Sequence, residues 1–156
     1  FDVDLPERQE SYRESACMAP GDATVIVATP AGRLGLSICY DLRFPELYRR
    51  LVASGAQWLV VPAAFTAATG EAHWEPLLRA RAIENLCYVV ASGQCGLHPS
   101  GRRTWGHSVI IDFWGRIIAE LPAGAGVIAG GIDLSAQDAA RRSFPALAHR
   151  RDDVFQ

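Results

Sequence analysis

The chain contains no lysine, and all 15 of its basic residues are arginine. It also contains no G-x-x-x-x-G-K-[ST] or G-x-G-x-x-G run, so nothing in it supports nucleotide binding. No apolar run approaches the roughly 20 residues that span a bilayer, which argues against a membrane segment. The formal net charge is -2 and basic runs are absent, which argues against nucleic acid as a partner. We interpret three isolated arginine pairs as solvated surface or as partners of carboxylates: Arg102-Arg103, Arg141-Arg142 and Arg150-Arg151.

The sequence also lacks cysteines and histidines at the spacings that are typical of metal ligands. The four cysteines form no C-x-x-C pair and the four histidines form no i, i+4 pair, so we expect no metal site. We recognise no secretory leader, so we expect reduced thiols and a cytoplasmic protein. A disulfide between Cys87 and Cys95 is the alternative, because their spacing permits one.

Length and composition favour one globular α/β domain. The chain has 156 residues, of which 49% are hydrophobic, enough for a buried core. Periodicity and turn residues predict strands at 23–28, 33–38, 58–61, 88–91, 108–111, 116–120 and 127–132, the third of them buried on both faces. They predict helices at 45–54 and 74–85, a last short helix capped by Ser135, and polar or loop segments at 1–22, 62–73 and 93–106. Strands and helices alternate through the middle, which is typical of α/β layers.

The segment 34–46 is the strongest candidate for a catalytic site. An apolar run ends on Cys39, and a helix start follows, with Pro45 suited to a first helical position and Glu46 to a first turn. A thiol that is aimed at a helix N-terminus lies where N–H groups favour the thiolate, as a cysteine nucleophile requires. The alternative is that Cys39 is a small buried hydrophobic residue, as most intracellular cysteines are.

Two kinds of catalytic base can be drawn from the sequence. His107 and Asp112 could complete a Cys–His–Asp set with Cys39, although such geometry is spatial and cannot be derived from spacing. The alternative for His107 is a ring that bonds loop backbone. Glu14 is the other candidate base, and its alternative is a solvated surface carboxylate.

Six segments, in order, resemble one known family. Residues 35–47 resemble the nucleophile motif of the nitrilase superfamily of carbon–nitrogen hydrolases, and residues 61–65, 69–75, 78–85, 105–108 and 112–115 resemble further motifs of that family. Residues 79–84 and 94–98 most resemble its deaminated glutathione amidase branch, with the omega-amidases next.

This resemblance implies a fold and partners. The fold would be a four-layer α-β-β-α sandwich, of which the chain is the C-terminal part. Residues 1–156 would then form a partial domain whose N-terminal part is missing. The full-length protein would be a homodimer that acts on a small-molecule amide without a metal or an organic cofactor.

The resemblance also implies a Glu–Lys–Cys catalytic set with Cys39 as nucleophile. The base glutamate and the lysine would lie upstream, because residues 1–2 match the end of the Lys-x-His-Leu-Phe-Asp stretch of the family. We therefore expect the chain to begin just after the catalytic lysine, which would account for the absence of lysine. Arginine is a poor substitute, because its delocalised fork does not act as a point charge or lose a proton.

Other roles follow residue by residue from the family motifs. Glu14 matches a second glutamate close to the lysine and the thiol, the N–H of Tyr40 matches an oxyanion donor, and Ala64 and Phe65 match the wall of the substrate pocket. Arg43 could form an internal salt bridge or bind a substrate carboxylate, and we favour the internal role.

The expected reaction is hydrolysis of a small amide to acid and ammonia through a thioester on Cys39. The alternatives are an omega-amidase, an N-carbamoyl amidohydrolase, or a half-domain without catalytic activity. We expect these 156 residues alone to be inactive, because two catalytic groups and part of each sheet would be missing.

Overall fold

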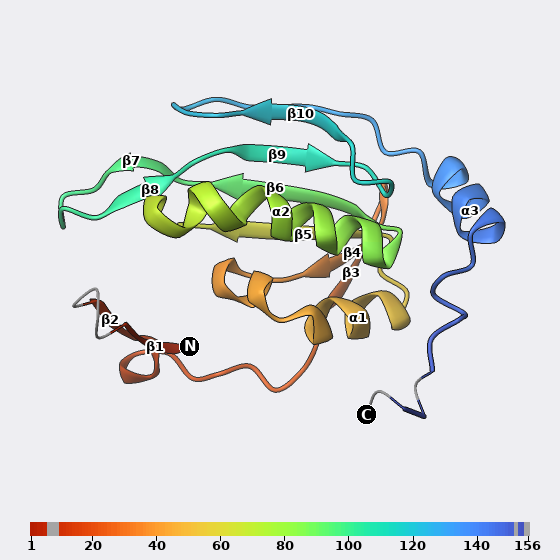
Figure 1. The fold of residues 1–156 in the computed structure, drawn as a ribbon, viewed down its shortest axis with the longest axis horizontal. Helices are drawn as coiled ribbons and strands as arrows, with labels where there is room; N and C mark the ends of the chain where they lie inside the picture. Colours follow the sequence, from red (N-terminus) through yellow and green to blue (C-terminus); the bar gives the residue numbers. More distant parts are fainter. Residues whose placement is uncertain (6–9, 152, 155–156) are drawn as a thin grey trace.

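A six-stranded mixed sheet forms the centre of the fold (Figure 1). The computed structural model describes residues 1–5, 10–151 and 153–154. The strand order is β10-β9-β6-β5-β4-β3, in which β4–β5 and β5–β6 are parallel pairs and the others are antiparallel. The strands are β3 (Ile26–Thr29), β4 (Gly32–Leu36), β5 (Trp58–Ala63), β6 (Tyr88–Gly93), β9 (Ser108–Ile111) and β10 (Ile117–Leu121).

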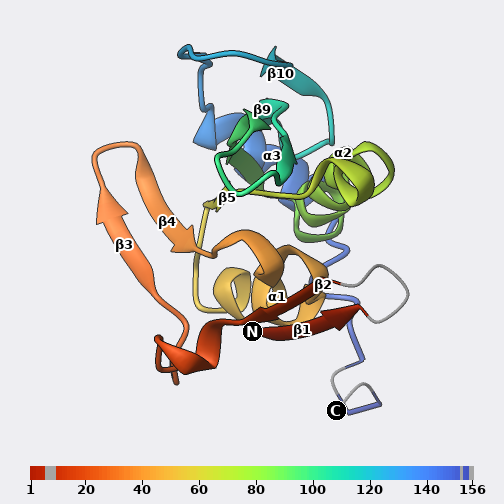
Figure 2. The same cartoon turned by 90° about the vertical axis from the view of Figure 1, so that its left-hand side faces the viewer.

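Helices α1 (Pro45–Ala53) and α2 (Ala67–Asn85) lie on one face of this sheet, as the side view in Figure 2 shows. They connect β4 to β5 and β5 to β6, which confirms the predicted α/β alternation. The core lies between these helices and the sheet. Its buried side chains include Tyr48, Leu51, Leu59, Val61, Trp74, Leu78, Val89 and Ile111. Full burial of an apolar side chain of this size contributes roughly 1.5–3 kcal/mol.

Elements with strong local signals form as predicted. Pro45 occupies the start of α1, and Gly55 adopts a φ of +98° just after the helix ends. The predicted hairpins β3–β4 and β9–β10 are both present. In the second hairpin, Oδ1 of Asp112 accepts the N–H groups of Trp114 and Arg116 at 2.8 and 2.9 Å, which closes the turn.

Helix α2 begins seven residues earlier than the sequence predicts, and its first turns fall in the segment predicted to be a loop. Gly70 and Pro76 both weaken the helix signal there. The glycine is required by packing, because a Cβ at position 70 would lie 2.4 Å from the Cβ of Trp105. A long-range contact that sequence periodicity does not reveal therefore explains the difference.

Two short hairpins lie in segments that we predicted to be irregular. The first pairs β1 (Asp2–Leu5) with β2 (Glu10–Arg13), and the second pairs β7 (Cys95–Leu97) with β8 (Arg103–Trp105). Two 3-10 turns, η2 (Glu14–Ala16) and η3 (Cys39–Arg43), follow β2 and β4. These four strands have only three or four residues and lie in polar, turn-rich segments, so no apolar alternation marks them in the sequence.

The C-terminal region departs from the prediction in two ways. Residues 127–132 form no strand in the described part of the chain, and the side chain of Val127 is 94% exposed. A strand needs a partner for its backbone groups, and no described strand pairs with this segment. Helix α3 (Leu134–Ser143) follows, and its cap is Asp133 rather than Ser135, because Oδ1 of Asp133 accepts the N–H of Ala136 at 2.9 Å.

Among the described residues, the face of the sheet opposite α1 and α2 is open mainly over β3 and β4, whereas Tyr88 and Ile110 on the same face are buried against residues 130–133. Leu59 and Val61 of β5 are buried toward the helices, whereas Trp58 and Val60 are half-buried on the other side. The prediction that this strand is buried on both faces is therefore wrong for this chain. In the described ranges, no helix is long and apolar enough to cross a membrane.

Candidate active site

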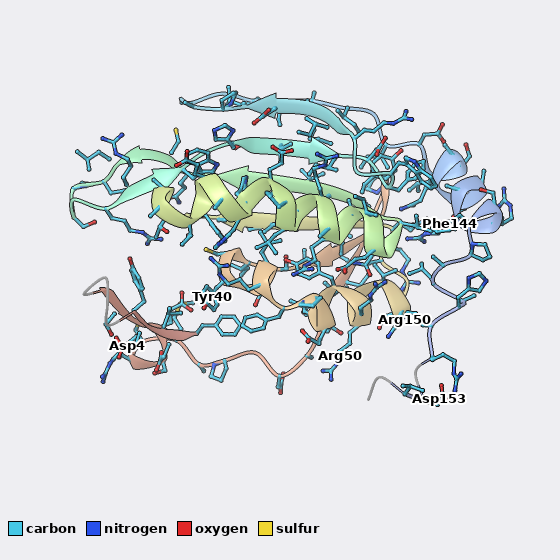
Figure 3. All side chains as sticks on the ribbon, in the orientation of Figure 1. Asp4, Tyr40, Arg50, Phe144, Arg150 and Asp153 are labelled. Carbon is cyan, nitrogen blue, oxygen red and sulfur yellow. The ribbon has the colours of Figure 1, made fainter. Side chains whose placement is uncertain are left out.

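A pocket of about 940 Å³ opens at the carboxyl ends of β4 and β5. This is the edge at which parallel α/β sheets bind ligands. The structure brings to it all the site residues that the sequence singled out by resemblance: Glu14, Cys39, Tyr40, Arg43, Ala64 and Phe65. Tyr40 belongs to η3, and Figure 3 shows it close to the β1–β2 hairpin; its ring centroid is 5.2 Å from that of Phe1.

The backbone of Cys39 has a conformation that residues other than glycine rarely adopt. Cys39 is the first residue of η3, and its φ is +48°, in the left-handed region. Such a conformation at a residue other than glycine costs about 1–3 kcal/mol and is frequent at catalytic sites. The half-buried side chain packs against the core and also lines the pocket, so the thiol faces both.

Asp41 closes the turn that holds Cys39. Its Oδ2 accepts the N–H of Ile38 at 2.8 Å, and its own N–H donates to the carbonyl of Ile38 at 3.0 Å. The two bonds join the residues on either side of the Cys39–Tyr40 pair, and so they fix where the thiol points.

Helix α2 holds the same turn from the core side through Arg81. The buried guanidinium donates from Nη2 and Nε to the carbonyl of Leu42 at 2.7 and 3.2 Å, and from Nη1 to Oε1 of Glu84 at 3.1 Å. It also lies 5.3 Å from the ring of Tyr48, whose hydroxyl is 2.8 Å from Oγ of Ser37. Burial raises the pKa of Tyr48 to about 12. The arginine-rich motif at 79–84 therefore supports the nucleophile turn, a role that the sequence did not reveal.

Arg43 forms no internal ion pair with any residue in the described ranges. Its guanidinium carbon lies 5.5 Å from the ring centre of Tyr40 and 5.1 Å from that of Phe65, and Nη1 is within hydrogen-bond distance, 3.3 Å, of Nδ1 of His73. The rings and His73 hold the guanidinium at the pocket without neutralising it. The internal salt bridge that we favoured from sequence has no partner in this part of the chain.

Glu14 lies at the rim of the pocket, at the start of η2. Its Oε2 accepts a hydrogen bond from the backbone nitrogen of Phe1 at 2.6 Å. This bond fixes the carboxylate beside the pocket that Cys39 also lines.

The alternative trio of Cys39, His107 and Asp112 is not assembled. Neither His107 nor Asp112 lines the pocket. Nδ1 of His107 is 2.6 Å from Oε1 of Glu120, and its ring stacks on Trp105 with centroids 4.6 Å apart. His107 therefore supports the packing of the hairpins, and Asp112 closes the β9–β10 turn.

The pocket also contains polar residues that sequence reasoning missed, namely Thr66, Thr69, His73, Gln94 and Arg102. They come from segments that we predicted to be loops, and Arg102 belongs to a pair that we interpreted as solvated surface or carboxylate-paired. A signal was present, because each segment directly follows a strand whose carboxyl end meets the pocket edge. No group of three His, Cys, Asp or Glu side chains among the described residues could hold a metal ion, and the four cysteines are free thiols.

Comparison with known proteins gives the family to which this fold belongs. Residues 1–142 match the carbon–nitrogen hydrolase family, and the chain belongs to it. Over 151 residues it is 48% identical to the deaminated glutathione amidase of Yersinia enterocolitica, an alignment that covers 97% of this chain and 53% of that protein. The chain thus spans about half the length of that relative.

Solved structures share the fold. The crystal structure of the Caenorhabditis elegans NitFhit protein matches with a TM-score of 0.88 and 46% identity, over 100% of this chain and 38% of that one. A mutant of the amidase from Nesterenkonia sp. AN1, with the acetamide moiety of fluoroacetamide attached to its active-site cysteine, matches with a TM-score of 0.77 and 28% identity, over 91% and 50%. The fold is therefore nitrilase-like α/β. The described residues form one six-stranded sheet, with α1 and α2 on one face, and two separate two-stranded hairpins. The four-layer arrangement therefore stays a prediction, as does the upstream position of the missing part.

Proposed function

We propose that the complete protein hydrolyses a small amide through a thioester on Cys39, and that its substrate resembles that of deaminated glutathione amidase. The observation that supports this most is the left-handed turn that presents Cys39 to a large pocket at the carboxyl end of β4. The attachment of an acetamide moiety to the active-site cysteine of a structural neighbour is consistent with a cysteine nucleophile.

In the proposed mechanism, Sγ of Cys39 attacks the amide carbon, and the thiol proton passes to the upstream glutamate. The oxyanion accepts hydrogen bonds from the N–H of Tyr40 and from the upstream lysine, and each such donor contributes roughly 3–4 kcal/mol in comparable sites. The carbon–nitrogen bond breaks, and the nitrogen takes the proton and leaves as ammonia or an amine. Water activated by the same glutamate then attacks the thioester, which releases the acid and restores the thiol.

The remaining pocket residues would bind the substrate. Ala64 and Phe65 form an apolar wall after β5, and the Glu14 carboxylate, which lines the same pocket, would hold the upstream lysine. Arg43 would bind a substrate carboxylate, because its guanidinium lines the pocket and no carboxylate of the described residues forms an ion pair with it.

The test uses the complete gene product and two thiols of the same pocket. Cys39→Ser should lower kcat at least a thousandfold, whereas Cys17→Ser, at the other cysteine that lines the pocket, should leave most of the activity. Fluoroacetamide should add an acetamide group to the peptide that contains Cys39 and not to the one that contains Cys17. Full activity of Cys39→Ser would reject the proposal.

The substrate class is tested by comparing kcat/KM for a panel of candidate amides and nitriles. Deaminated glutathione should have the highest kcat/KM, above omega-monoamides of dicarboxylic keto acids, N-carbamoyl amino acids and nitriles. A higher value for one of the others would reassign the protein to that branch.

We further propose that the isolated 156-residue chain is inactive. The DNA immediately before the Phe1 codon should encode Lys-x-His-Leu in frame, with a glutamate further upstream. A stop codon there would instead favour a half-domain without catalytic activity, as would a frame without lysine.

A further inference from the structure

Arg102 lies in the connection of the β7–β8 hairpin, and the backbone of this connection is well fixed. The N–H of His98 donates to the carbonyl of Arg102 at 2.8 Å, and the N–H of Gly101 donates to the carbonyl of His98 at 2.9 Å. Nε2 of His98 lies 2.7 Å from Oγ1 of Thr104. These bonds give Arg102 a defined position at the base of the turn.

The hairpin is also docked on the wall of the pocket. Thr66 and Thr104 form a β-bridge, and the N–H of Trp105 donates to the carbonyl of Phe65 at 2.9 Å. Nη2 of Arg102 donates to the carbonyl of Ala64, so the guanidinium is held against the residues that follow β5. Arg102 consequently lines the same pocket as Cys39.

The charge of Arg102 is not neutralised by any residue in the described ranges. The carbonyl of Ala64 takes one of the five N–H bonds of the guanidinium, and the ring of Tyr12 lies 5.2 Å from its central carbon. Nε is buried and has no acceptor among the described residues. A buried donor of this kind normally has a partner, so an acceptor for Arg102 is missing from this part of the molecule.

The pocket as a whole has an excess of positive charge. Arg13, Arg43 and Arg102 line it, whereas Glu14, to which the proposed mechanism assigns the upstream lysine, is its only carboxylate among the described residues. Arg13 faces Asp2, whose pKa is lowered mainly by hydrogen bonds from Ser15 and to a lesser degree by this arginine. Among the described residues, no ion pair joins Arg43 or Arg102 to a carboxylate.

We propose that Arg102 binds a second carboxylate of the substrate, so that the protein acts on amides with two carboxylates, one at Arg43 and one at Arg102. This inference rests on the proposed amidase function. The two arginines belong to different elements and lie on different rings, Arg43 on Tyr40 and Phe65 and Arg102 on Tyr12. One planar guanidinium binds one carboxylate in a bidentate manner, so a single carboxylate would leave the other arginine without an anion.

The first test compares Arg102→Gln with Arg103→Gln in the complete gene product. Arg103 is the exposed neighbour, does not line the pocket, and loses the same charge in its variant. The substrates are an amide with two carboxylates and its monomethyl ester. The wild type should prefer the diacid at least tenfold in kcat/KM, and Arg102→Gln should reduce this preference at least tenfold, mainly through KM. Arg103→Gln should keep the preference, and Arg102→Lys should restore part of it.

The second test needs no turnover and separates this inference from the proposed function. In a Cys39→Ala background, calorimetry measures the affinity for dicarboxylates from glutarate to sebacate and for their monomethyl esters. A member of the series should bind at least tenfold more tightly than its ester, and Arg102→Gln should remove that difference.

The possible results have distinct meanings. A binding difference without hydrolysis of any amide would reject the amidase function and support the role of Arg102. Equal loss of affinity for diacid and ester in Arg102→Gln would overturn the inference, since it would indicate that Arg102 pairs with a carboxylate elsewhere in the complete protein. Equal affinity of the wild type for diacid and ester would overturn it without any variant.

Discussion

At the scale of single residues, burial keeps two weakly acidic side chains, those of Tyr48 and Cys87, in their neutral form. Burial raises the pKa of the Cys87 thiol to about 12 and that of the Tyr48 hydroxyl to about 12, from ordinary values of 9.0 and 10.0. Both side chains belong to the core, Tyr48 from α1 and Cys87 just before β6. Their ionisation therefore requires unfolding or a rearrangement of the core.

The free energy of unfolding should fall as the pH rises from 9 to 12. Below pH 9 both groups are protonated in both states and the stability is complete. Above it the unfolded chain loses protons that the folded chain keeps, so the unfolded state binds fewer protons and the stability decreases, by about 1.4 kcal/mol per pH unit for each group past its ordinary value. Denaturant titrations of the complete protein at several pH values measure this slope. Cys87→Ala should flatten the slope between pH 9 and 10, and an unchanged slope would contradict the assignment.

At the scale of elements, the short turn η3 is held by several hydrogen bonds from its own residues and from α2. Asp41 ties the middle of the turn to Ile38 at its start, and Arg81 on α2 donates to the carbonyl of Leu42 near its end. Such a turn holds one side chain in a strained conformation only because its surroundings leave it no alternative. Asp41 is thus a positioning residue for Cys39.

Asp41→Ala should lower kcat at least tenfold, with a smaller change in KM, because the thiol loses its fixed direction. Asp41→Asn keeps an oxygen that can accept the N–H of Ile38 and should recover most of kcat. Asp112→Ala is the matched control, because Asp112 closes the β9–β10 turn in the same way away from the pocket. It should lower the melting temperature without changing kcat. Equal kcat losses in Asp41→Ala and Asp112→Ala would indicate a general effect of stability.

Elements determined by local interactions could be predicted from the sequence, and those determined by distant contacts could not. Helix α1 and the β9–β10 turn follow from Pro45 and Asp112. The first turns of α2 depend on the contact between Gly70 and Trp105, thirty-five residues apart, which no local pattern contains. The site shows the same division. Cys39 was found from its local motif, whereas Arg102 reaches the pocket only because its hairpin docks beside Phe65.

On the scale of the whole molecule, the open face of the sheet determines how the isolated chain behaves. Val27 and Leu36 are 41% and 36% exposed there, and Val60 and Val90 are half-buried on the same face. Nε1 of Trp58 on this face is buried without an acceptor among the described residues. An apolar surface of this kind indicates a site of association with further protein.

The isolated chain should therefore bind a hydrophobic dye and aggregate, while the complete protein should do neither. Leu36→Gln should have opposite effects in the two forms. It should reduce dye binding by the isolated chain, because it removes exposed apolar area, and lower the melting temperature of the complete protein, because it buries a polar group. Arg33→Gln, at an exposed residue of the same strand, is the control. An unchanged melting temperature for Leu36→Gln in the complete protein would show that this face stays open.

The left-handed turn at Cys39 also bears on how this position can evolve. Glycine adopts a φ of +48° without the steric penalty that any other side chain incurs there. Relief of this backbone strain alone would therefore favour glycine at position 39, at the expense of the contacts that the Cys39 side chain makes with the core. A lineage that had lost the need for a nucleophile should drift in that direction. The amino acid found at this position in related chains is therefore a record of whether each one has remained under selection for chemistry.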